Sequence, residues 1–186
     1  ADSGIPEPLP TEREPARLLI VLYSPDDAYS IDAVEAVQQS VKANTNHNGS
    51  GEWATEVFVL PNNGTKQGRA TASQLMEMMR SSSASTTFVL LWAITNAMCP
   101  GFLEYLAEKL RWVMSQHPQF LLIAFDPLLT RVLLNGIYVS HIAHYIARQG
   151  LLVASVGDAL LRYAVEYGRP LYVCRKRVSY RHSNRL

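Results

Sequence analysis

Short polar side chains follow the apolar runs of this sequence and are its first candidates for chemistry. In an open α/β sheet, ligands bind outside the carboxyl ends of the strands, where the strand order reverses. The residues that such a sheet would bring to one crevice are Ser24, Asp27, Asn96, Asp126 and Asp158. A nucleotide- or nucleoside-binding enzyme of this fold would have its site there. The alternative is that each residue caps the helix that follows it, since capping preferences predict the same residue types.

The loop that contains Gly64, Lys66 and Gly68 is a second candidate ligand site. Its glycines would let the backbone approach an anion, and its lysine would supply positive charge. A phosphate-binding loop has Lys-Ser/Thr after its second glycine, which this loop lacks. The residues 23–29 also contain none of the glycines of a dinucleotide-binding turn. An ordinary solvated loop is the alternative.

Three further residues fit incomplete chemical sets. His141 and His144 lie three residues apart, so a helix would place both on one face, but no third metal ligand accompanies them. A histidine pair that is buried or faces a partner is the alternative that we prefer. Cys99 precedes a helix start, which would stabilise a thiolate, but no base can be assigned to it. We therefore expect no catalytic residues, no metal and no cofactor.

The C-terminal residues 175–186 differ in charge from the rest of the chain. They hold five of the 17 basic residues and none of the 16 acidic ones, so the formal net charge of +1 is the sum of a −4 body and a +5 tail. The candidate nucleic-acid or anion contacts are Arg175, Lys176, Arg177, Tyr180, Arg181 and Arg185. The cations would contact phosphates, and the tyrosine could stack on a base. The alternative is a solvated tail that keeps the acidic body soluble or docks on it.

The elements that would position these residues form one α/β domain over residues 17–174, between a Pro-rich extended arm (1–16) and the basic tail. Six runs are continuously apolar, which is typical of strands covered on both faces. These runs are 18–23, 57–60, 88–94, 120–125, 151–154 and 171–174. Segments of helical periodicity separate them. The pattern predicts a three-layer, open, mostly parallel six-stranded sheet of the flavodoxin/Rossmann-like type, with helices on both faces.

The segment 128–149 is the least regular of the connections. We expect a helix that is apolar on nearly all sides, with Gly136 as a point where it splits in two. Such a helix is either deeply buried or docked on a partner. The segment therefore predicts a protein–protein contact with another subunit, to which the arm 1–16 would contribute.

Residues 19–27 resemble the first box of TIR and SEFIR signalling domains, in which a strand ends in Tyr-Ser and an acid follows. Here Tyr23 and Ser24 end the predicted strand, and Asp26 and Asp27 supply the acid. The expected order of strands and helices agrees with those families as well. The resemblance, over under a tenth of the chain, implies a signalling interaction domain that associates with itself.

Residues 158–173 resemble the closing segment of nucleoside deoxyribosyltransferase-like enzymes, where a helix with Glu-x-Gly-x-Ala runs into Gly-Lys-Pro and a final strand. The matching positions are Ala164, Gly168 and Pro170, with Arg169 in place of the lysine. Leu160 stands at the position of the family's catalytic glutamate, and Arg162 at that of a glycine that makes room for substrate. The resemblance implies a fold relative that has lost its nucleophile.

The composition narrows the classes of function that remain. The 186 residues are 48% hydrophobic and 18% charged, enough apolar material for one core. Two cysteines are too few for a disulfide scaffold, and the longest apolar runs of six or seven residues are far below the ~20 of a transmembrane helix. These features indicate an intracellular protein of the cytoplasm or mitochondrial matrix.

We therefore expect a non-catalytic α/β scaffold or adaptor subunit of a larger assembly, whose basic tail contacts RNA, an anionic lipid surface or another anionic partner. One alternative is a nucleotide- or nucleoside-binding enzyme with its site at the carboxyl ends of the strands. A TIR/SEFIR-like interaction domain is the other.

Overall fold

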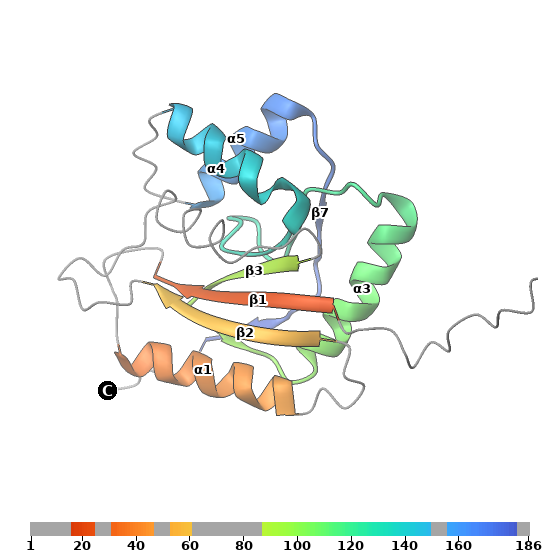
Figure 1. Ribbon diagram of the computed structural model, residues 1–186. Coiled ribbons are helices and arrows are strands. Elements are labelled where there is room, and N and C mark those ends of the chain that lie inside the picture. Colours follow the sequence, from red (N-terminus) through yellow and green to blue (C-terminus); the bar gives the residue numbers. More distant parts are fainter. Residues whose placement is uncertain (1–15, 25–30, 47–52, 61–86, 150–155, 182–186) are drawn as a thin grey trace, which may run out of the picture.

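The computed structural model describes residues 16–24, 31–46, 53–60, 87–149 and 156–181 (Figure 1). It contains a six-stranded sheet in the order β2-β1-β3-β6-β5-β7. The strands are β1 (Ala16–Tyr23), β2 (Trp53–Leu60), β3 (Thr87–Ala93), β5 (Leu122–Ala124), β6 (Arg131–Asn135) and β7 (Leu171–Val173). Strand β6 is antiparallel to both of its neighbours, and the other paired strands are parallel. The predicted open, mostly parallel sheet is thereby confirmed.

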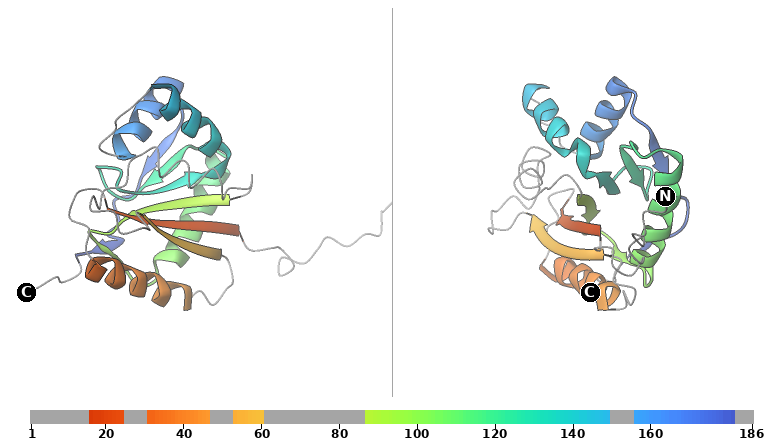
Figure 2. Two further views of the ribbon diagram at one scale, coloured as in Figure 1. Left: turned by 60° about the vertical axis from the view of Figure 1, so that its left-hand side comes forward. Right: turned by 45° about the vertical axis from the view of Figure 1, so that its right-hand side comes forward.

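Helices cover both faces of this sheet, as the continuous apolar runs predict (Figure 2). Helices α1 (Ile31–Asn46) and α3 (Phe102–Gln116) pack on one face, and α4 (Val139–Gln149) and α5 (Val156–Tyr167) on the other. Alternate residues of β1 enter the two cores: Ile20 packs with the α1 and α3 side and Val21 with the α4 and α5 side, and both are fully buried. A strand buried in this way has no polar face, so it reads as an unbroken apolar run.

The segment 128–149 departs from the predicted helix. Residues Arg131–Asn135 form strand β6, a short 3₁₀ helix follows at Gly136–Tyr138, and α4 begins only at Val139. The first half of the prediction was wrong because a short buried strand and a buried helix are both continuously apolar, so periodicity cannot separate them. Val132, Leu133 and Leu134 are completely buried in this chain's own core. The apolar surplus of the segment therefore gives no reason for a partner.

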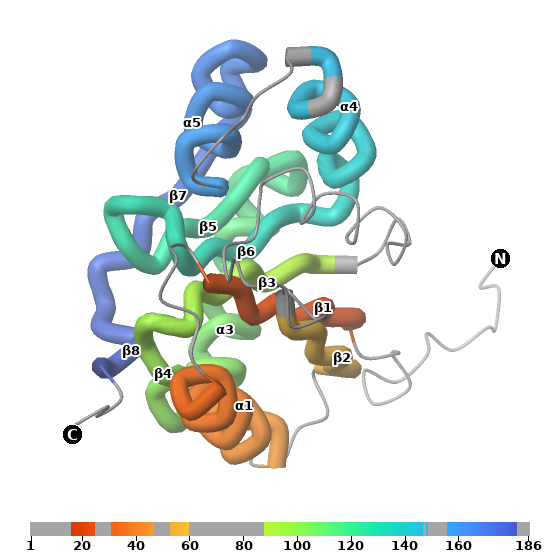
Figure 3. The backbone as a smooth tube through the Cα atoms, turned by 90° about the vertical axis from the view of Figure 1, so that its left-hand side faces the viewer, coloured from red at the N-terminus to blue at the C-terminus, as the bar shows by residue number. Residues whose placement is uncertain are grey.

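A second, two-stranded sheet attaches the start of the basic tail to the domain. Strand β4 (Ala97–Met98) pairs with β8 (Ser179–Tyr180) in antiparallel fashion. The backbone N–H of Cys99 donates to the carbonyl of Val178 at 2.9 Å, and the Val178 side chain is buried. Residues 175–181 are thus a docked segment and not a free extension, and Figure 3 shows their path from β7 down to β8.

Several predicted features lie outside the described residues, namely residues 1–15 of the arm, the Gly64–Gly68 loop and the strand at 151–154. Ala16, the last residue of the predicted arm, begins β1 instead. Within the described ranges, no helix is long and apolar enough to cross a membrane.

Candidate functional site

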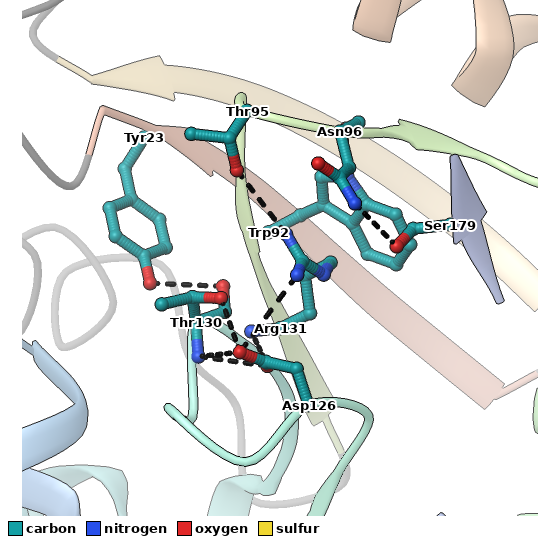
Figure 4. Close-up of polar contacts among 8 residues, drawn as sticks. All are labelled: Tyr23, Trp92, Thr95, Asn96, Asp126, Thr130, Arg131 and Ser179. Carbon is teal, nitrogen blue, oxygen red and sulfur yellow. Dashed lines mark hydrogen bonds and ion pairs between the residues drawn. The ribbon is translucent and has the colours of Figure 1, made fainter. Parts of the chain in front are cut away.

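The antiparallel direction of β6 determines which residues meet at the carboxyl edge of the sheet. Its first residue, Arg131, pairs with Trp92 near the end of β3, and Tyr23 at the end of β1 pairs with Ala93. The polar cluster at this edge is formed by Tyr23, Trp92, Thr95, Asn96, Asp126, Thr130, Arg131 and Ser179 (Figure 4). We call it the carboxyl-edge cluster.

Asp126 is the centre of this cluster. It follows β5, and its carboxylate accepts hydrogen bonds from the Thr130 N–H at 2.9 Å, the Thr130 Oγ1 at 2.6 Å and the Arg131 N–H at 2.8 Å. These bonds close the turn between β5 and β6. The same turn holds Leu129 at a φ of 56°, a left-handed conformation that is uncommon for a leucine. Asp126 therefore shapes the backbone of its own turn.

Arg131 is a buried cation with weak partners. Its Nη2 lies 3.9 Å from Asp126 Oδ2, and its Nη1 donates to Thr95 Oγ1 at 3.4 Å. The guanidinium lies 5.9 Å from the centroid of the Trp92 ring, which favours a cation. Its Nε is buried and has no hydrogen-bond partner among the described residues. A buried donor without an acceptor is costly, so this atom marks a place where a water or a ligand oxygen would be bound.

Tyr23 joins the end of β1 to the same turn. Its hydroxyl donates to the carbonyl of Thr130 at 3.0 Å, and the N–H of Ala93 donates to that carbonyl at the same distance. Burial raises the pKa of Tyr23 well above its usual value, and the nearby Asp126 carboxylate raises it further, whereas Arg131 acts in the opposite direction. The phenol is neutral and serves as a hydrogen-bond donor.

Asn96 connects the carboxyl-edge cluster to the docked basic segment. Its Nδ2 donates to Ser179 Oγ at 3.0 Å, and its backbone carbonyl accepts from Trp92 Nε1 at 2.8 Å. Because Ser179 belongs to β8, these contacts fix residues 175–181 beside the ends of the strands.

Only some of the predicted ligand residues belong to the carboxyl-edge cluster. Asp126 and Asn96 belong to the cluster, and Ser24 is fully buried at the end of β1. Asp158 does not cap α5, because the helix begins at Val156 and places this carboxylate, exposed, in its first turn. The residues Asp27, Gly64, Lys66 and Gly68 lie outside the described residues.

Sequence reasoning missed Arg131 because its segment was assigned to a helix. A signal was present: this arginine directly precedes the apolar run Val132–Leu134. A charge at the boundary of a short apolar run is typical of a strand end. Thr130, Trp92 and Ser179 gave no such signal, since their roles depend on segments that are distant in the sequence.

The predicted histidine pair does not form a buried site. His141 and His144 are both exposed on α4. The Nδ1 of His141 lies 2.5 Å from the Tyr163 hydroxyl, and its ring packs with Tyr163 and Tyr167 of α5. No group of three or more His, Cys, Asp or Glu side chains that could hold a metal occurs in the described part of the chain. The contacts of His141 thus pack α4 against α5.

The basic segment presents its charges to solvent. Arg175, Lys176, Arg177 and Arg181 are exposed, as is Tyr180, and Arg185 lies outside the described residues. Lys176 Nζ lies 4.4 Å from the ring centroid of Tyr105 on α3. Burial and a hydrogen bond with the Cys174 side chain raise the pKa of Tyr105 to about 12. The segment is therefore positioned on α3 as well as on β4.

The first prediction concerns the Asp126 turn. Asp126→Ala removes the acceptors of the turn and leaves Arg131 as a buried charge without its counterion, so we expect a loss of about 3–5 kcal/mol in the free energy of unfolding. Asp126→Asn keeps one oxygen acceptor, so its loss in the free energy of unfolding should be smaller. Urea unfolding measures both, with Asp158→Asn as the exposed control. A loss below about 1 kcal/mol for Asp126→Ala would show that the turn does not depend on this carboxylate.

The second prediction concerns alkaline pH. An unfolded tyrosine titrates near pH ~10, and burial raises the pKa of Tyr23 above that value in the folded state. The stabilisation by the neutral phenol is therefore complete below about pH 10 and falls as the pH rises further. In Tyr23→Phe, the free energy of unfolding should fall less steeply between about pH 9 and pH 11, as measured by urea unfolding. Identical slopes in both proteins would contradict this assignment.

The TIR/SEFIR and deoxyribosyltransferase resemblances stay predictions. No protein-family model matches the chain, and no curated protein is significantly similar to it.

Proposed function

We propose that this chain is a non-catalytic α/β scaffold or adaptor subunit of a larger assembly, and that its basic segment 175–181 contacts an anionic partner such as RNA. The observation that carries the proposal is the exposed charge of this segment. Four cations and no acid lie within seven residues. An anionic partner would release counterions from these side chains on binding, which favours association.

The segment is docked on the body with its cations exposed, and this order would favour the binding of a partner. The β4–β8 pairing and the buried Val178 hold its backbone, and Lys176 packs on Tyr105. Side chains on an ordered backbone lose less conformational entropy when they bind than those of a free tail. Residues 1–174 carry a net charge of −4, so an anionic partner would be directed to this segment.

The carboxyl-edge cluster supports a structural role for the residues that an enzyme of this fold would use. Asp126 accepts hydrogen bonds from its own turn, and Asn96 donates to Ser179. These groups hold the chain in place. Both cysteines are free thiols, which fits the intracellular compartment that we propose, cytoplasm or mitochondrial matrix.

A charge-matched pair of variants tests the proposal. Arg175→Gln/Arg181→Gln should elute from a heparin column at clearly lower salt than the wild type, because each removed cation weakens the salt-dependent attraction. Lys42→Gln/Arg162→Gln removes two exposed cations elsewhere and should elute with the wild type. Equal elution of the Arg175/Arg181 variant and the wild type would contradict the role of the segment.

A second candidate function is the binding of a nucleotide or nucleoside at the carboxyl edge, and the unpartnered Arg131 Nε favours it. A ligand at about 100 times its Kd would stabilise the fold by roughly 2.7 kcal/mol and raise the Tm by about 5–10 °C. Thermal-shift screening of nucleotides, nucleosides and inorganic phosphate measures this. A shift that is lost in Arg131→Met would favour this function, and no shift with any compound would exclude it for these ligands.

A further inference from the structure

Helix α3 and the segment 169–177 run side by side, and their contacts define a seam (Figures 1 and 2). The ring centroids of Trp112 and Tyr172 are 5.9 Å apart, and those of His117 and Tyr172 are 6.0 Å apart. Further along, Lys176 packs on Tyr105. We call this surface the α3 seam. It extends from the end of α3 to the basic segment, over ~18 Å of helix.

The seam combines cations with aromatic rings. On α3, Tyr105, Lys109 and Trp112 follow one another at spacings of four and three residues, so they share one helix face. Lys109 Nζ lies 4.7 Å from the Trp112 ring centroid. The acids Glu104 and Glu108 precede this row by one position each and thus lie on the neighbouring stripe of the helix. The row itself contains no acid.

A groove of about 400 Å³ lies at the end of the seam. Its lining residues are His117, Pro118, Gln119, Arg169 and Pro170. This volume is within the ~300–1,000 Å³ of small-ligand sites. Hydrogen bonds hold its walls, since the Leu121 N–H donates to the Pro170 carbonyl at 2.8 Å and the Tyr138 hydroxyl to the Gln119 carbonyl. The Arg169 guanidinium lies 5.3 Å from the Tyr138 ring centroid. These contacts hold the backbone of the groove, and Arg169 supplies one positive charge beside it.

Trp112 is the tryptophan that solvent reaches. Its exposed fraction is 50%, against 6% for Trp53 and 0% for Trp92. A large ring that stays half exposed beside cations offers a surface on which a base can stack. Stacking needs a base that is not already inside a duplex, which distinguishes single-stranded from double-stranded nucleic acid.

We propose that the α3 seam binds single-stranded nucleic acid. Trp112 stacks on a base, Lys109, Arg169 and Lys176 contact phosphates, and the groove at His117 and Arg169 receives an adjacent nucleotide. This inference rests on the proposed function, whose anionic partner it specifies. An acidic protein would bind the cations of the seam but would gain nothing specific from the exposed Trp112 ring. The combination of cations and an exposed ring therefore favours nucleic acid.

Tryptophan fluorescence tests this directly, with a uridine oligomer of about eight nucleotides as the probe. Because Trp53 and Trp92 are buried, stacking on Trp112 should quench the solvent-exposed part of the emission. Trp112→Ala should weaken binding roughly tenfold, as measured by anisotropy of a labelled oligomer. Trp112→Phe should retain most of the affinity. Met114→Ala truncates another exposed apolar side chain of α3 and should bind as the wild type does. Circular dichroism verifies that each variant is folded.

A duplex of the same length and polyglutamate serve as competitors. We expect the single-stranded oligomer to bind more tightly than either. Lys109→Gln/Lys176→Gln removes two of the proposed phosphate contacts, so its log–log salt dependence should be shallower by about 1.4. The nucleic-acid inference is wrong if the wild type binds polyglutamate with the same affinity as the oligomer and Trp112→Ala leaves both affinities unchanged. In that case the anionic contact stands. If the wild type binds none of the three, the anionic contact of the proposed function fails as well.

Discussion

The turn closed by Asp126 is the interaction on which the rest of the structure depends. Its carboxylate bonds to Thr130 and Arg131, reverses the chain after β5 and starts β6 as an antiparallel strand in the middle of the sheet. Without this reversal, Arg131 would not lie at the carboxyl edge. The strained φ of Leu129 is maintained because the surrounding hydrogen bonds and its buried side chain leave it no alternative.

The packing of α5 relies on the same turn. A Cβ added to Gly157 would lie 2.4 Å from the Leu128 carbonyl oxygen, too close for any other residue to fit without backbone movement. The start of α5 therefore touches the β5–β6 turn directly. This contact links the polar edge of the sheet to the α4 and α5 layer, in which His141, Tyr163 and Tyr167 pack together.

The C-terminal residues of this chain are basic and the rest is acidic, and the fold places the basic segment 175–181 on one surface. The basic segment leaves β7 beside α3 and is attached at β4, so its cations continue the row of cations and aromatic rings along the α3 seam. A free tail would carry the same charge with no defined direction. The docked segment forms one surface with Trp112 and the groove at Arg169. This continuity is the physical basis of the nucleic-acid partner that we propose.

The sequence by itself determined the fold class, because strands covered on both faces must be apolar, as residues 18–23 of β1 and 88–93 of β3 are. It also determined the charge of the C-terminal segment and the positions of Asn96 and Asp126 at strand ends. Only the tertiary structure decided that Val132–Leu134 is a strand, since strand pairing with Phe88–Trp92 and Leu122–Ala124 selects between two conformations that the apolar run fits equally. It also decided what surrounds Arg131 and Trp112, because their neighbours come from distant parts of the chain, and local patterns contain no information about such contacts.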